Sequence, residues 1–142
     1  MTTDRLFVYG TLRRFFGHAM HAVLAEHAEF AGEGTMAAQL FDLGRYPGAV
    51  LSAAGDERVV GEVYRLREPQ AAETLRRLDE YEGVAPGATE PREYRRDRTS
   101  VRMTGGETID AWVYVLNRVP RHGRRIESGD YTRWRAEPST ST

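Results

Sequence analysis

One acidic residue, Glu82, stands out as a candidate for chemistry because of where it lies in the segment 73–83 (ETLRRLDEYEG). At about 100° per residue, Glu82 falls on the same narrow arc of a helix as Ala71, Leu75 and Leu78. The three apolar residues favour burial, and an unpaired carboxylate beside them is costly unless it finds a partner or changes its pKa. The pattern therefore makes Glu82 the first residue to consider for acid–base catalysis.

Two physical effects support this choice. Glu82 lies in the last turn of the expected helix, where the helix dipole disfavours a negative charge. It also lies on the core-facing arc, where desolvation disfavours the charge again. Both effects raise a carboxyl pKa toward neutrality, as a general base requires. The alternative is a glutamate at a helix end that reaches solvent or pairs with an arginine, and the pattern alone leaves that alternative open.

Other familiar sites are absent or weak. The chain has no phosphate-binding G-x-x-x-x-G-K loop and no G-x-S-x-G nucleophile elbow. It also has no cysteine and no lysine, which excludes a thiol nucleophile and a Schiff base. Gly32 and Gly34 form only a fragment of a dinucleotide-binding motif. His18 and His21 have a spacing that could bind a metal, but no third ligand is nearby, so we expect no metal site.

Composition favours one compact domain, which we place at residues 1–137, with a disordered polar tail at 138–142. The chain has 142 residues, 40% of them hydrophobic, and a net charge of −1. No apolar run approaches the roughly 20 residues of a membrane span, so we expect a cytoplasmic protein. Arginines cluster at 92–98 and 118–125 and could bind phosphate. Interspersed acids favour a mixed, solvated surface instead, and we expect no nucleic-acid or membrane partner.

The hydropathy pattern predicts five or six strands and two helices. Strands are expected at 5–9, 32–43, 49–51, 59–66, 94–103 and 108–116, with a turn at 46–48 and helices at 18–27 and from Pro69 to Glu82. Gly83 should end the second helix. Because strands and helices do not alternate regularly, the pattern favours an α+β fold with a bent or barrel-like sheet.

Five short motifs resemble those of a known family and occur in its order. They are 7–12 (FVYGTL), 61–64 (GEVY), 78–83 (LDEYEG), 94–96 (YRR) and 112–115 (WVYV). Together they resemble the γ-glutamylcyclotransferase-like superfamily, in particular its short AIG2-like and γ-glutamylamine cyclotransferase members. The segment 127–131 (ESGDY) is similar to an ending of some bacterial members. The resemblance implies a small mixed barrel of about six strands with flanking helices and a pocket at one end.

The resemblance also implies a reaction, in which a γ-glutamyl amide cyclises to 5-oxoproline and releases an amine without a cofactor. It places the catalytic glutamate at Glu82 and the substrate loop at Tyr9, Gly10, Thr11 and Leu12. A side chain at position 10 would block close approach of the substrate, which explains the glycine there. The alternative is that Gly10 and Thr11 form an ordinary turn after a buried strand.

Tyr94 and Tyr114 are weaker candidates for the pocket, because a tyrosine in a strand usually belongs to the core. The resemblance does not identify the leaving amine or decide between a monomer and a homodimer. A non-catalytic protein that binds a small molecule on the same fold stays open as the alternative.

Overall fold

The computed structural model describes residues 4–10, 19–44, 46–52, 57–83 and 93–136. The expected tail at 138–142 lies outside these ranges. The described strands are β1 (Arg5–Val8), β2 (Ala28–Asp42), β3 (Pro47–Leu51), β4 (Arg58–Leu66), β5 (Tyr94–Met103), β6 (Thr108–Leu116) and β7 (Arg124–Arg125), and the helices are α1 (Ala19–His27), α2 (Ala71–Glu82) and α3 (Tyr131–Ala136).

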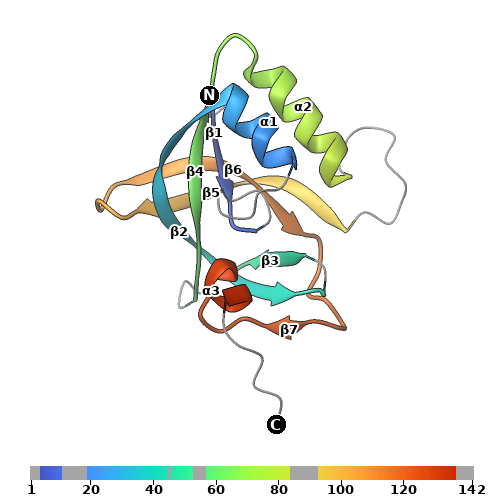
Figure 1. Cartoon of the computed structure of the whole chain (residues 1–142). Coiled ribbons are helices and arrows are strands. Elements are labelled where there is room, and N and C mark those ends of the chain that lie inside the picture. Colours follow the sequence, from blue (N-terminus) through green and yellow to red (C-terminus); the bar gives the residue numbers. More distant parts are fainter. Residues whose placement is uncertain (1–3, 11–18, 45, 53–56, 84–92, 137–142) are drawn as a thin grey trace.

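Five strands close a mixed barrel in the order β2, β4, β1, β6, β5, with β5 pairing again with β2 (Figure 1). β1 runs parallel to β6, and the other pairs around the barrel are antiparallel. The second half of β2 leaves the barrel and pairs with β3 and β7. This arrangement confirms the predicted α+β class and the bent, mixed barrel.

The long strand β2 makes the closure possible because it bends. A bulge shifts its register against β4 between Phe30 and Gly32, and Gly32 has a φ of +134° that few other residues adopt. Gly34 lies so close to β5 that a Cβ atom there would be 2.8 Å from the carbonyl oxygen of Arg102. The glycines therefore let one strand pair with both β4 and β5.

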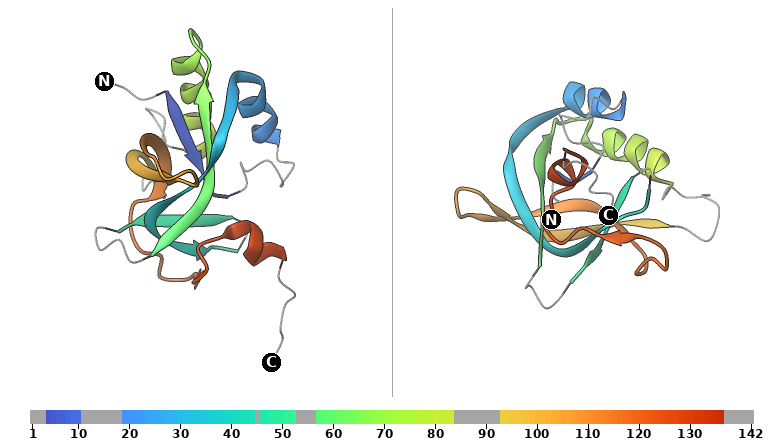
Figure 2. Two further views of the ribbon diagram at one scale, coloured as in Figure 1. Left: turned by 90° about the vertical axis from the view of Figure 1, so that its left-hand side faces the viewer. Right: turned by 60° about the horizontal axis from the view of Figure 1, so that its bottom comes forward.

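The barrel wall separates two cores. The inner core fills the barrel with alternate residues of every barrel strand, among them Phe7, Met36 and Val113. The outer core lies between the barrel and the two helices α1 and α2, which cover one side of it (Figure 2), and contains Leu24 and Leu78. The position of α2 on this outer core decides where Glu82 points.

Helix α2 starts and ends at specific residues. Its first hydrogen bond runs from the Thr74 N–H to the Gln70 carbonyl, so the helix begins at Ala71 and Pro69 precedes it, contrary to the predicted start. Gly83 takes a left-handed conformation, and its N–H donates to carbonyls of the last turn. The predicted end of the helix, with Glu82 in its last turn, is confirmed.

Three other expectations need correction. Pro47 and Gly48 belong to β3, where Pro47 is paired with Asp42, because proline is tolerated at the start of an edge strand. β2 begins at Ala28 rather than residue 32. The sequence pattern did not predict β7 or α3. α3 lies at the end of the barrel away from α1 and α2 (Figures 1 and 2), and it buries Tyr131 in the inner core.

Within the described ranges, none of the helices has the length and apolar character needed to cross a membrane.

Candidate functional site

Glu82 ends α2 above the barrel wall. The apolar arc that carries it is buried at Ala71 and Leu78 and partly buried at Leu75. Glu82 itself keeps some contact with solvent, yet its desolvation raises the pKa of the carboxyl from 4.5 to about 7. Among the described residues, no arginine or hydrogen-bond donor pairs with this carboxylate. Near neutral pH, Glu82 can therefore both accept and donate a proton.

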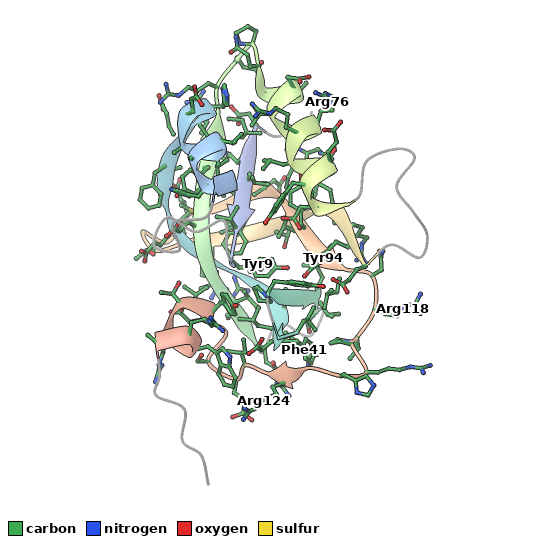
Figure 3. All side chains as sticks on the ribbon, turned by 45° about the vertical axis from the view of Figure 1, so that its right-hand side comes forward. Tyr9, Phe41, Arg76, Tyr94, Arg118 and Arg124 are labelled. Atoms are coloured by element: carbon green, nitrogen blue, oxygen red, sulfur yellow. The ribbon has the colours of Figure 1, made fainter. Side chains whose placement is uncertain are left out.

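Three tyrosines from different parts of the chain surround this carboxylate. Tyr9 follows β1, Tyr94 begins β5, and Tyr114 lies in β6; Figure 3 labels the first two near the C-terminal end of α2. Burial raises the pKa of each hydroxyl, and the charge of Glu82 raises it further in all three cases. The structure thus brings together four residues that the sequence analysis named separately.

Tyr9 holds the chain in place after β1. Its hydroxyl donates to the carbonyl of Tyr114 at 2.7 Å and accepts a hydrogen bond from the N–H of Ala49 at 3.1 Å. One side chain thereby connects β1 to both β6 and β3. Because both hydrogen bonds are internal and the ring is buried, Tyr9 fixes the position of Gly10 next to it.

Gly10 has a structural reason of its own to be a glycine. A Cβ atom there would lie 2.6 Å from Cγ of Pro47, which is closer than real contacts allow. The packing of Pro47 thus excludes a larger residue without any substrate present. Thr11 and Leu12, the other two loop residues named from the sequence, lie outside the described residues.

Tyr94 closes the opposite side of this group. Its hydroxyl donates to the carbonyl of Pro47 at 2.8 Å, and its ring lies 6.2 Å from the ring of Tyr46. Tyr46 is exposed and donates to the carboxylate of Glu93 at 2.7 Å. Tyr46 and Glu93 therefore form a polar contact at the outer edge of the site, and neither residue was singled out from the sequence.

Tyr114 belongs to a cluster that the sequence analysis did not find. Its hydroxyl donates to Asp79 at 2.7 Å, and Arg96 binds the same carboxylate through two hydrogen bonds of 2.8 and 3.2 Å. The guanidinium of Arg96 also lies 4.4 Å from the ring centre of Trp112. The partners of Asp79 lie on two strands that are distant in the sequence. The pairing of β5 with β6 brings Arg96 and Tyr114 together beside it.

A second buried carboxylate lies near the site. Glu62 is fully buried, and the hydroxyl of Tyr64 donates to its Oε1 at 3.0 Å. Glu62 is paired with Val8 of β1, two residues before Gly10. Glu62 belongs to the motif 61–64, but its place in that motif did not indicate a role for the acid.

The histidines do not form a described metal site. His21 makes an edge contact with the ring of Tyr64, the two centres being 6.0 Å apart, and His18 lies outside the described residues. In the described part of the chain, no three histidine, aspartate or glutamate side chains gather around a common point.

Comparisons with known proteins agree on one family. A family model described as gamma-glutamyl cyclotransferase, AIG2-like, matches residues 6–133. Over 133 residues the chain is 32% identical to a putative gamma-glutamylcyclotransferase from Methanocaldococcus jannaschii, which covers 93% of this chain and 98% of that protein. Over 128 residues it is 35% identical to the gamma-glutamylcyclotransferase family protein YtfP from Escherichia coli K12, covering 89% of this chain and 95% of YtfP.

A solved structure gives the same answer. An AIG2-like protein from Mus musculus superimposes with a TM-score of 0.63 at 27% identity, covering 85% of this chain and 82% of the mouse chain.

Proposed function

The chain belongs to the AIG2-like gamma-glutamyl cyclotransferase family, and from this premise we propose that it converts a γ-glutamyl amide to 5-oxoproline and a free amine, with Glu82 as the general acid and base. The substrate is a small molecule, and the reaction needs no cofactor because its nucleophile is the α-amine of the substrate itself.

The proposed reaction balances without water. The α-amine nitrogen attacks the γ-carbonyl carbon, a new ring C–N bond forms, and the amide C–N bond to the leaving amine breaks. Glu82 takes one proton from the attacking nitrogen and returns one to the leaving nitrogen. Holding amine and carbonyl together in one molecule supplies much of the acceleration, because intramolecular attack avoids the entropy cost of bringing two reactants together.

The observation that carries this proposal is the chemical state of Glu82. A carboxyl with a pKa of about 7 is poised to exchange protons at neutral pH, whereas an ordinary glutamate is a weak base. The described residues offer it no ion pair that would hold it permanently charged. Tyr9, Tyr94 and Tyr114 surround it with side chains whose raised pKa values keep them neutral.

The loop after β1 is the proposed binding element for the substrate. Backbone N–H groups of Gly10, Thr11 and Leu12 would bind a carboxylate or the carbonyl oxygen on which negative charge develops. The structure describes only Gly10 of this loop. The hydrogen bonds of Tyr9 support the proposal, because they fix the point from which the loop starts.

The test is a panel of γ-glutamyl amines and γ-glutamyl dipeptides, with 5-oxoproline measured by mass spectrometry. We expect turnover of at least one substrate by the wild-type protein and a loss of about 10²–10⁴-fold in Glu82→Gln. Glu80→Gln is the matched control, because Glu80 is an exposed acid on the same helix that pairs with Arg76. Equal turnover by Glu82→Gln and wild type would show that the base is assigned wrongly.

Saturable binding of a γ-glutamyl compound without 5-oxoproline would instead favour the alternative, a non-catalytic binding protein.

A further inference from the structure

A second region of the barrel has the composition of a ligand site and lies away from Glu82. It is an open groove of about 540 Å³ on the outer wall, a volume typical of small-molecule sites. The first residue of β4 and the second half of β5 line it, together with residues of β2, β3 and β6. We call it the arginine groove, because Arg58, Arg98 and Arg102 line it together with the hydroxyl residues Ser52, Thr99, Ser100 and Thr108.

Two of these arginines converge on one residue of β2. Arg58 donates from Nε to the Thr35 hydroxyl at 3.0 Å and from Nη2 to the Thr35 carbonyl at 2.8 Å. Arg102 is paired directly with Thr35 across the β2–β5 ladder. The Thr35 position therefore brings the two cations to the same part of the groove, and the two hydrogen bonds hold the Arg58 side chain in place.

The two cations repel each other. Burial lowers the pKa of Arg58 from its usual value, and the charge of Arg102 lowers it further. An anion bound between them would relieve this repulsion. Guanidinium groups bind phosphate and carboxylate oxygens through paired hydrogen bonds, so they suit such a ligand.

Several arginines of the sheet have an acidic partner, whereas the described residues supply none to Arg58 or Arg102. Arg96 binds Asp79, and Arg98 lies 3.5 Å from Asp110. Among the described residues, no acidic side chain lies within ion-pair distance of Arg58 or Arg102. The acids of the described residues therefore do not neutralise the positive charge of Arg58 and Arg102.

We propose that the arginine groove binds a small oxyanion, carried as a phosphate or a carboxylate, between Arg58 and Arg102. The hydroxyl groups of Ser52 and Ser100 are further donors in the same groove. A small molecule fits better than a nucleic acid, because the chain has a net charge of −1 and Asp110 is paired directly with Ser100 at the rim. The proposal does not depend on the reaction at Glu82, which lies at the other end of β5 beside Tyr94.

The test is calorimetric titration of the full chain with inorganic phosphate and, separately, with succinate, at constant ionic strength. We expect saturable binding of at least one probe. Replacing Arg102 by glutamine should weaken it at least about tenfold, which corresponds to roughly 1.4 kcal/mol. Arg102→Lys should recover part of the affinity, because it restores the charge without the planar fork. A preference for phosphate or for succinate identifies the source of the oxyanion.

Arg65→Gln is the matched control. Arg65 is an exposed arginine near the other end of β4 that pairs with Asp4 outside the groove, so its replacement should leave the affinity unchanged. Arg102→Gln should also keep the wild-type turnover of any γ-glutamyl substrate.

Three results would each overturn the proposal. They are the absence of saturable binding for both probes, equal affinity in wild type and Arg102→Gln, and tighter binding of longer oligonucleotides with a steep dependence on salt.

Discussion

Two of the carboxylates on helix α2, those of Asp79 and Glu82, have surroundings that differ sharply although they are three residues apart. Asp79 accepts one hydrogen bond from the Tyr114 hydroxyl and two from Nε and Nη2 of Arg96. Glu82, one turn later, has no such partner among the described residues, and its pKa rises to about 7. The difference shows that one helix can hold an acid with hydrogen-bonded partners and an acid with a raised pKa one turn apart.

The geometry of the sheet explains the difference. Arg96 and Tyr114 are paired directly across β5 and β6, so both side chains leave the barrel at the same level. Asp79 lies opposite them and receives both donors. Glu82 lies one turn further along the helix, near Tyr94, whose hydroxyl is already bound to the Pro47 carbonyl. The hydrogen bonds to Asp79 thus hold the helix against the sheet, and they occupy the guanidinium of Arg96.

The largest expected effect is on turnover. Glu82→Gln should lower kcat by about 10²–10⁴-fold, because an amide cannot exchange the proton. Asp79→Asn should lower kcat by less than about tenfold in protein that is still folded, since Glu82 keeps its carboxyl. Release of 5-oxoproline measures both variants. Equal losses in the two variants would contradict the division between a structural and a reactive acid.

The next expected effect is on the free energy of unfolding, where the loss of Asp79 should matter. Asp79→Asn should lower the free energy of unfolding by about 2–3 kcal/mol, because it leaves a partly buried Arg96 without its counter-charge. Asp97→Asn is the control: its ion pair with Arg95 is exposed and should contribute about 0.5 kcal/mol or less. Urea denaturation of both variants gives the comparison.

The third prediction concerns pH. Because the pKa of Glu82 is raised in the folded protein, the folded state binds more protons than the unfolded state between about pH 4.5 and 7. The contribution of Glu82 to the free energy of unfolding is therefore greatest below this range and falls as pH rises through it. Relative to wild type, Glu82→Gln should gain about 2 kcal/mol between the two ends of the range, after allowing for partial solvent contact.

Urea denaturation of wild type and Glu82→Gln on both sides of this range measures the gain. A difference between them that stays constant with pH would show that the Glu82 carboxyl is not perturbed by folding.

The smallest expected effect is at Tyr114. Tyr114→Phe removes one hydrogen bond to a charged acceptor and should cost about 1–2 kcal/mol of unfolding free energy. In a double-mutant cycle with Asp79→Asn, the two losses should be less than additive, because both changes break the same interaction. Strict additivity would mean that the contact between the two side chains contributes nothing measurable.

Much of the fold could be predicted from local patterns. The β-rich segments at 59–66, 94–103 and 108–116 are strands within a residue of the predicted bounds. Gly83 ends α2 because glycine takes the left-handed conformation easily. Pro47 was misassigned to a turn, because a turn signal in the sequence does not distinguish a turn from the first residue of an edge strand.

The candidate site was only partly predictable. Glu82 could be found because the helical period shows an acid among buried positions. Asp79, Tyr46 and Glu93 gave no such signal, since their contacts join residues that are 17 to 47 positions apart in the chain. The glycine at position 10 was attributed to close approach of the substrate. In the structure, the packing of Pro47 against Gly10 is by itself a sufficient reason for it.

The sequence by itself determined the family, the class of fold and the presence of an acid on the buried face of α2, because each depends on residue types at short, regular spacings. Only the tertiary structure decided that, of Asp79 and Glu82, the first receives an arginine from the sheet. It also decided that Arg58 and Arg102 lie beside Thr35, where the described part of the chain places no acid within ion-pair distance. The reason is the same in both cases: pairing of side chains follows the register of strands distant in the chain, and local periodicity does not specify that register.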